Sequence, residues 1–185
     1  ASLAWILIRQ RDAVGAAAFD LTVDRLIPPR STNIQLKSIL GYLDSLAPSD
    51  KTSCADAIHQ VARVIRKRGL TIVISDFFDS PEKITQALRH LHFKKQEVIA
   101  IWVLDPLEHH FYNTRNLHLV DRETGEQITL DGNVASQYFQ KGYTHHRELV
   151  EKACREYGIE SCLVTTDMPF VKALYRVLER RSRMS

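Results

Sequence analysis

The chain has few of the residues on which several classes of function depend. Its 185 residues include only seven glycines and three cysteines, and the formal net charge is +3. Without a glycine-rich loop to wrap a phosphate, nucleotide binding is not expected. The mild charge gives no reason to expect nucleic acid as a partner. The odd, widely spaced cysteines Cys54, Cys154 and Cys162 favour a reducing cytosol over a disulfide-linked secreted fold.

Long hydrophobic runs are also missing. The longest apolar run, Val98 to Leu104, is much shorter than the roughly 20 residues of a membrane-spanning helix. We therefore expect neither a membrane span nor a signal peptide in this chain. Its first residues, ASLAWILIRQRD, open inside a helical pattern without an initiator Met. We expect the sequence to be a piece of a longer protein that is truncated at its N-terminus.

Apolar runs of strand length alternate with amphipathic helical segments, and this alternation is typical of an α/β fold. The fold class that we predict is a doubly wound, mostly parallel sheet with helices on both faces, in one domain over residues 1–185. We expect four strands to lie parallel. The small apolar residues of 12–20 indicate a strand that is covered on both faces. The predicted elements are a hairpin of strands 12–20 and 21–29, helices 32–46 and 53–67, strand 70–75, helix 80–93, strand 97–104, a hairpin around residues 123–125, helix 134–157 ended by Gly158, strand 159–167 and helix 169–180.

Three acidic residues follow predicted strands, and in parallel sheets ligands bind where the carboxyl ends of strands meet. Asp105 and Asp167 are interpreted as caps of the helices that follow. Asp76 differs, because Asp79 and Ser80 lie nearer the next helix and can cap it. The carboxylate of Asp76 is then left without a structural role.

A second polar cluster precedes the helix before that strand. Ser53 and Asp56 have the spacing of a capping box, which leaves the hydroxyl of Thr52 free to point into the loop. A hydroxyl and a carboxylate at one sheet edge outline a site for a hard cation such as Mg²⁺. The alternative is that Asp76 only caps a helix or pairs with Lys51.

The other polar clusters in the sequence give weaker indications of a functional site. The pairs His109-His110 and His145-His146 lack an acid or cysteine at ligand spacing, and we assign them to surface or packing. Basic residues near helix ends, among them Arg68, are interpreted as solvated faces.

Taken in order, several segments resemble the bacterial family called domain of unknown function 58. They are RQRDAVGAAAFD, LIPPRSTNIQL, LTIVISDFFDSPEKITQALRHL, EVIAIWVLDPLE and YGIESCLVTTDMPF, and together they cover nearly the whole chain. The resemblance implies a three-layer fold similar to the von Willebrand factor A domain, with one antiparallel edge strand.

The family resemblance also implies a metal-ion-dependent adhesion site. Its ligands are an Asp-x-Ser-x-Ser motif after the first strand, a later Thr matched by Thr52, and an Asp matched by Asp76. The first motif is absent, and the central strand that should carry it is missing from this chain. Mg²⁺ is therefore expected only if upstream ligands are present. A further departure is Lys51, where relatives carry glycine.

The function implied by the resemblance is a non-enzymatic protein-interaction module, in which a metal accepts a carboxylate from the partner. The implied partner is a MoxR-type AAA+ ATPase, and the implied parent is a membrane-anchored protein whose domain faces the cytoplasm. The alternative is a Mg²⁺-dependent hydrolase or phosphatase that uses Asp76. Against it, Phe78 occupies the place where a phosphatase of the haloacid dehalogenase type needs a second Asp.

Overall fold

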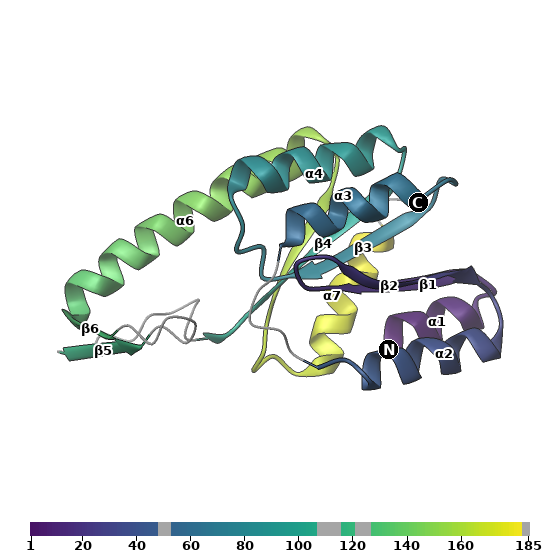
Figure 1. Cartoon of the computed structure of the whole chain (residues 1–185), viewed down its shortest axis with the longest axis horizontal. Helices are drawn as coiled ribbons and strands as arrows, with labels where there is room; N and C mark the ends of the chain where they lie inside the picture. Colours follow the sequence, from purple (N-terminus) through teal and green to yellow (C-terminus); the bar gives the residue numbers. More distant parts are fainter. Residues whose placement is uncertain (48–52, 107–115, 121–126, 183–185) are drawn as a thin grey trace. The chain divides into compact units, whose positions relative to one another are not determined.

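A computed structural model describes residues 1–47, 53–106, 116–120 and 127–182 of the chain (Figure 1). The chain divides into two compact units, Ala1–Lys67 and Arg68–Ser185. Each unit has its own helices and its own strand pairing. That both belong to one domain remains a prediction.

The first unit is built around a two-stranded antiparallel sheet. Its strands β1 (Val14–Phe19) and β2 (Val23–Arg30) pair as the sequence predicts. No residue of β1 is fully buried, so the expectation of a strand covered on both faces is wrong. The small side chains of β1 instead permit close approach. A Cβ on Gly15 would stand 2.6 Å from the carbonyl oxygen of Ile27 in β2. The elements of this unit are α1 (Ser2–Arg9), β1 (Val14–Phe19), β2 (Val23–Arg30), α2 (Asn33–Asp44) and α3 (Cys54–Val64).

Helix α2 fastens this hairpin through two side chains. The amide nitrogen of the buried Gln35 donates to the carbonyl oxygens of Val14 and Pro28, each at 2.8 Å. The hydroxyl of Tyr42 accepts from the backbone of Ala18 at 3.1 Å and donates to the carbonyl of Arg25 at 3.2 Å. Because buried polar groups cost free energy unless they are bonded, these contacts fix how α2 lies on the strands.

The second unit contains a three-stranded parallel sheet in the order β3 (Leu70–Ser75), β4 (Glu97–Leu104), β7 (Glu160–Thr165). Three of the four strands predicted to lie parallel are therefore confirmed, whereas the fourth, β1, belongs to the first unit and pairs antiparallel with β2 there. That β1 also lies parallel to this sheet stays a prediction. The elements are β3 (Leu70–Ser75), α4 (Pro81–Phe93), β4 (Glu97–Leu104), β5 (Asn116–Val120), β6 (Gln127–Asp131), α6 (Gly132–Glu156), β7 (Glu160–Thr165) and α7 (Phe170–Ser182).

Strand β4 is the centre of this unit, and all but two of its eight residues are buried. Helices α4 and α6 lie over one face of the sheet and α7 over the other, as a doubly wound fold requires (Figure 1). Residues Asn116–Val120 and Gln127–Asp131 form the predicted hairpin. Within the described residues, no helix is both long and apolar enough to cross a membrane.

Two helix ends in this unit lie where the sequence predicts them. Ser80 caps α4 by accepting the backbone amide of Lys83 at 3.3 Å, and Pro81 opens the helix. Gly158, with φ of +63°, ends α6, where the amide of Ile159 returns to the carbonyl of Cys154 at 2.8 Å. Both are common solutions for the unpaired backbone groups of helix ends.

Candidate functional site

Asp76 lies directly after β3, at the carboxyl edge of the parallel sheet, as the sequence predicts. Its side chain is exposed. One carboxylate oxygen accepts the backbone amide of Phe78 at 3.1 Å and faces the hydroxyl of Ser75 at 3.4 Å. The expectation that this carboxylate has no structural role is therefore wrong. It closes a local turn, as Asp side chains do where the backbone leaves a strand.

The segment between this turn and α4 is held by its own polar groups. Asp79 accepts the backbone amide of Ser80 at 2.8 Å, and the hydroxyl of Ser80 donates to Glu82 at 3.0 Å. The pKa of Glu82 is lowered because its carboxylate accepts a hydrogen bond from its own backbone amide and another from Ser80. Capping is thus assigned to Ser80, with Asp79 beside it, as predicted.

Phe77 adopts a backbone conformation that aromatic residues rarely take. Its φ is +55°, in the left-handed region, and its side chain is fully buried. The left-handed region costs an L-residue roughly 1–2 kcal/mol, so other contacts must hold it there. The ring packs on Trp102 with centroids 4.8 Å apart, and the carbonyl oxygen accepts from Nε2 of His146 at 2.9 Å.

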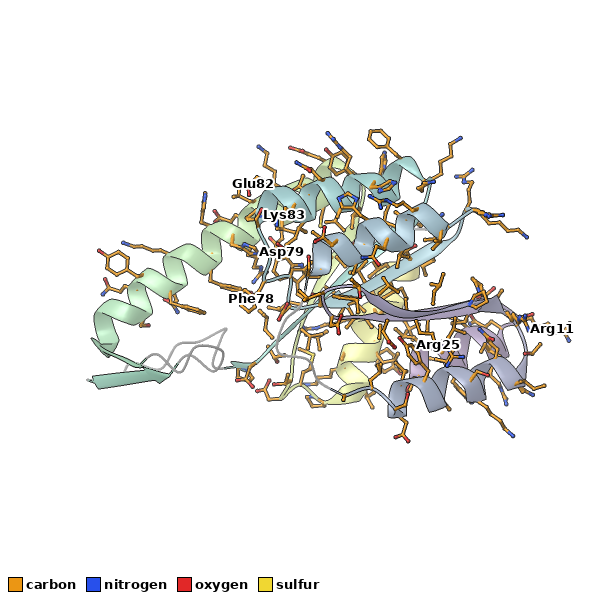
Figure 2. The ribbon with its side chains drawn as sticks, in the orientation of Figure 1. Arg11, Arg25, Phe78, Asp79, Glu82 and Lys83 are labelled. Carbon is orange, nitrogen blue, oxygen red and sulfur yellow. The ribbon has the colours of Figure 1, made fainter. Side chains whose placement is uncertain are left out.

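This conformation turns the next residue, Phe78, outward against α6. Phe78 stays 48% exposed, and its ring centroid lies 6.2 Å from that of Tyr143 and 6.5 Å from that of His146. Figure 2 shows Phe78 and Asp79 in the segment that leads into α4. The loop after β3 and the middle of α6 therefore share one apolar surface.

That surface is hollowed into a cavity of about 300 Å³, which we call the aromatic groove. Tyr138, on its helical wall, is 76% exposed. A Cβ on Gly142 would meet no atom within 4 Å, so the wall is open at this position. The stacked rings of Phe139 and Tyr143 are 6.4 Å apart. The groove is lined by Phe78, Tyr138, Phe139, Gly142, Tyr143 and His146.

Sequence reasoning missed the residues that α6 contributes to this groove. His145 and His146 are assigned to surface or packing, and this is confirmed: His145 is exposed and His146 packs against Trp102, 6.1 Å between centroids. The overlooked signal is the spacing of Tyr138, Gly142 and His146, which places them on one face of a helix. The pair His109 and His110 lies outside the described residues.

The acids after the other two strands have different surroundings. Asp105, after β4, accepts from the hydroxyl of Thr166 at 3.3 Å, while the amide of Thr166 donates to Leu104 at 2.9 Å. Asp105 thus helps to join the ends of β4 and β7. Asp167 lies three residues before the start of α7, so it does not occupy the capping position that was predicted.

The predicted metal ligands are only partly described. Thr52, with Lys51, lies outside the described residues, and Ser53 donates to Asp56 at 2.8 Å without accepting a backbone amide of α3. Among the residues with a described position, no three His, Cys, Asp or Glu side chains gather as a metal site. Asp76 alone cannot hold Mg²⁺, which prefers several oxygen ligands. Metal binding therefore stays a prediction.

A second cavity, of about 690 Å³, runs beside β7 and is walled by charged residues of α6 and α7. Arg147 and Glu151 form an ion pair at 2.6 Å, and Arg176 donates to the carbonyl oxygen of Leu163 at 2.7 Å. Arg176 thereby covers one polar group of the β7 edge. Such charged cover is a common protection of exposed strand edges.

Solved structures with a similar fold come from Bacteroides. A conserved hypothetical protein described as BatB, from Bacteroides thetaiotaomicron, has a TM-score of 0.58 at 17% identity, covering 99% of this chain and 86% of that chain. An aerotolerance-related membrane protein of Bacteroides fragilis has a TM-score of 0.60 at 16% identity, covering 98% and 86%. At this level of identity the likeness concerns the fold alone.

Sequence relatives come from mycobacteria. An uncharacterized protein of Mycobacterium avium is 30% identical over 131 residues, which are 70% of this chain and 76% of that protein. An uncharacterized protein of Mycobacterium tuberculosis is 29% identical over 131 residues, and the match spans 40% of its length. A family model described as protein of unknown function DUF58 matches residues 1–149. The chain therefore belongs to the DUF58 family, as its sequence segments indicated.

Proposed function

We propose that the chain is a non-enzymatic protein-binding module whose partner docks at the aromatic groove. The observation that carries this proposal is the left-handed conformation of Phe77, which presents Phe78 to solvent beside α6. A strained backbone persists only where surrounding contacts enforce it, and such strain gathers at functional positions. Here the enforcing contacts come from Trp102 and His146.

The chemistry of the groove suits a protein partner. Aromatic side chains are enriched in the centres of protein interfaces, because they remove much apolar area from water at a small cost in conformational entropy. Phe78, from the loop after β3, and Tyr138, from α6, both line the groove and expose large rings. An apolar side chain of the partner that enters the groove would be removed from water there.

The partner that we propose to test first is a MoxR-type AAA+ ATPase, which the family resemblance implies. The same resemblance implies that the domain faces the cytoplasm. It also implies that a divalent metal held by Asp76 and Thr52 contributes to partner binding. The ATPase, the cytoplasmic orientation and the metal are inferred from the family resemblance, whereas the docking site is inferred from the residues that line the groove. Since the relatives are uncharacterized proteins, binding to the ATPase is the first question for experiment.

The experiment measures binding of the purified ATPase to the chain by surface plasmon resonance. Phe78→Ala and Tyr138→Ala should each weaken binding at least about tenfold, as central aromatic residues of interfaces do. Tyr175→Ala is the matched control, because Tyr175 on α7 is 70% exposed but lies outside the groove. Equal losses in all three variants would refute the groove as the docking site. Failure of the wild-type chain to bind would remove the ATPase as its partner.

A further inference from the structure

The amino edge of the parallel sheet, opposite to the edge of Asp76, gathers two neighbouring loops. The amide of Glu97 donates to the carbonyl of Gly69 at 3.0 Å, which joins the start of β4 to the start of β3. The buried Gln96 links the loop before β4 to the start of β3, because it accepts from Thr71 at 3.3 Å and donates to the carbonyl of Lys94 in its own loop at 3.3 Å. Residues on either side of these contacts are therefore close together.

This edge carries an excess of exposed positive charge. Arg68 stands next to Gly69, and Lys94 and Lys95 stand directly before Gln96. Arg89, one turn earlier on α4, adds a fourth exposed cation. Glu97, the first residue of β4, is an exposed acid beside these two loops, but the four cations outnumber it.

A large aromatic side chain projects among these cations. Phe93, the last residue of α4, is 70% exposed. The guanidinium of Arg89 lies 5.9 Å from the centroid of its ring, and the ring of His92 meets it edge-on at 6.1 Å. We call Arg68, Arg89, Phe93, Lys94 and Lys95 the basic edge.

The backbone conformation at Lys95 is one that destabilises the fold when the residue is a lysine and not a glycine. Lys95 has a φ of +57° and ends α4 as glycine usually does, with its amide bonded to His92 at 2.8 Å and that of Gln96 bonded to Leu91 at 3.2 Å. Glycine adopts this conformation without the penalty that an L-residue meets. The local fold alone would favour glycine.

We propose that the basic edge binds an anionic phospholipid surface. Each Lys or Arg near such a surface contributes attraction that corresponds to about a fivefold gain in partitioning, and an exposed Phe can enter the interface. Charge complementarity therefore selects an anionic partner. A lipid surface fits better than single-stranded nucleic acid, because bases need open ring faces for stacking and Arg89 covers one face of Phe93. This inference is independent of the proposed protein-binding role.

Co-sedimentation of the chain with vesicles tests the proposal. The chain should bind vesicles of phosphatidylcholine mixed with phosphatidylglycerol, should not bind phosphatidylcholine alone, and should be released by salt. The double variant Lys94→Gln, Lys95→Asn should lower the partition coefficient roughly 30-fold, since two attractive charges are lost. Phe93→Ser should lower it about fivefold.

The matched control is Lys83→Gln with Lys172→Gln, which removes the same charge from exposed positions near the other edge of the sheet. It should retain wild-type binding. Equal binding to both lipid mixtures, no binding, or equal losses in the two double variants would each overturn the proposal. So would binding of a single-stranded oligonucleotide that survives where vesicle binding fails.

Lys95→Gly separates a lipid-binding role from a structural one. The variant should melt at a higher temperature, because glycine relieves the left-handed conformation, and it should bind anionic vesicles about fivefold more weakly. A higher melting temperature with unchanged vesicle binding would contradict the role proposed for this side chain.

Discussion

The imidazole of His146 donates a hydrogen bond from Nε2 to the carbonyl oxygen of Phe77 at 2.9 Å, and 69 positions separate the two residues in the chain. This bond joins α6 to the loop that follows β3. It also fixes the orientation of the peptide that precedes Phe78. The shape of the aromatic groove therefore depends on a contact between two distant segments.

Loss of this contact should weaken both the fold and the groove. We expect His146→Ala to lower the free energy of unfolding by about 1–2 kcal/mol, the usual cost of removing one partner of a partly buried hydrogen bond. His145→Ala is the control, since His145 is exposed on the same helix and should change stability by less than about 0.5 kcal/mol. Urea denaturation of both variants measures the difference. Equal effects would mean that the Phe77 carbonyl does not need His146.

The backbone strain at Phe77 predicts which of two substitutions, alanine or glycine, destabilises the protein more. Phe77→Ala should cost about 3–5 kcal/mol, because it empties a fully buried site beside Trp102. Phe77→Gly leaves a slightly larger cavity but relieves the left-handed conformation, so it should be less destabilising than Ala by about 0.5–1 kcal/mol. Denaturant midpoints decide the order. A less stable glycine variant would show that φ at this position is not strained.

Much of the second unit could be predicted from the sequence. The apolar run LTIVIS has the bounds of β3, Leu70–Ser75, because a short β-branched run between turn residues has few other solutions. Ser80, Pro81 and Gly158 mark helix ends through local hydrogen bonding, which needs no tertiary information. The same holds for the two antiparallel hairpins.

The candidate site was less accessible to sequence reasoning. The prediction correctly placed Asp76 after β3, but the bond from its carboxylate to the amide of Phe78 is a matter of backbone conformation. The left-handed state of Phe77 is also not encoded by its residue type, since it results from packing on Trp102 and His146. Sequence patterns report local preferences, whereas the groove is formed by contacts between distant elements.

Alkaline pH should destabilise the protein through Cys154. Burial, with the nearby charge of Glu151, raises the pKa of this thiol from about 9 to about 12. Above pH 9 the unfolded chain releases the thiol proton while the folded chain retains it, so stability falls as the pH rises toward 12. The loss at pH 11 should be about 2–3 kcal/mol.

The comparison for this prediction is Cys154→Ala, measured by urea denaturation at about pH 8 and pH 11. The variant lacks the titrating thiol, so its stability should fall less between the two pH values than that of the wild type. All other ionisable groups are the same in both proteins, so their contributions cancel in the comparison. Parallel losses in wild type and variant would assign the alkaline effect to those other groups.

Two substitutions at Asp76 separate its turn-forming role from a metal-binding role. Asp76→Asn keeps an oxygen that can accept the amide of Phe78 but removes the charge that Mg²⁺ requires. It should leave stability unchanged and abolish any part of partner binding that a chelator removes. Asp76→Ala should additionally cost about 1 kcal/mol of stability.

Thr52→Ala belongs to the same experiment, because Thr52 is the second predicted ligand. It should match Asp76→Asn in its loss of chelator-sensitive binding. If wild type and all three variants bind the partner equally with and without chelator, neither residue is a metal ligand. The aromatic groove would then account for binding without a cation.

The most direct test of the groove as a docking site is a substitution that fills the groove and also stabilises the fold. Gly142→Leu places a side chain where a Cβ meets no atom within 4 Å, and it replaces a helix-weakening glycine, so stability should rise by about 0.5–1 kcal/mol. Gly41→Leu is the matched control, since Gly41 in α2 is equally open. The measurement is the dissociation constant of the ATPase for both variants. We predict at least about tenfold weaker binding for Gly142→Leu and wild-type binding for Gly41→Leu, whereas wild-type binding by Gly142→Leu would contradict the assignment of the groove as the docking site.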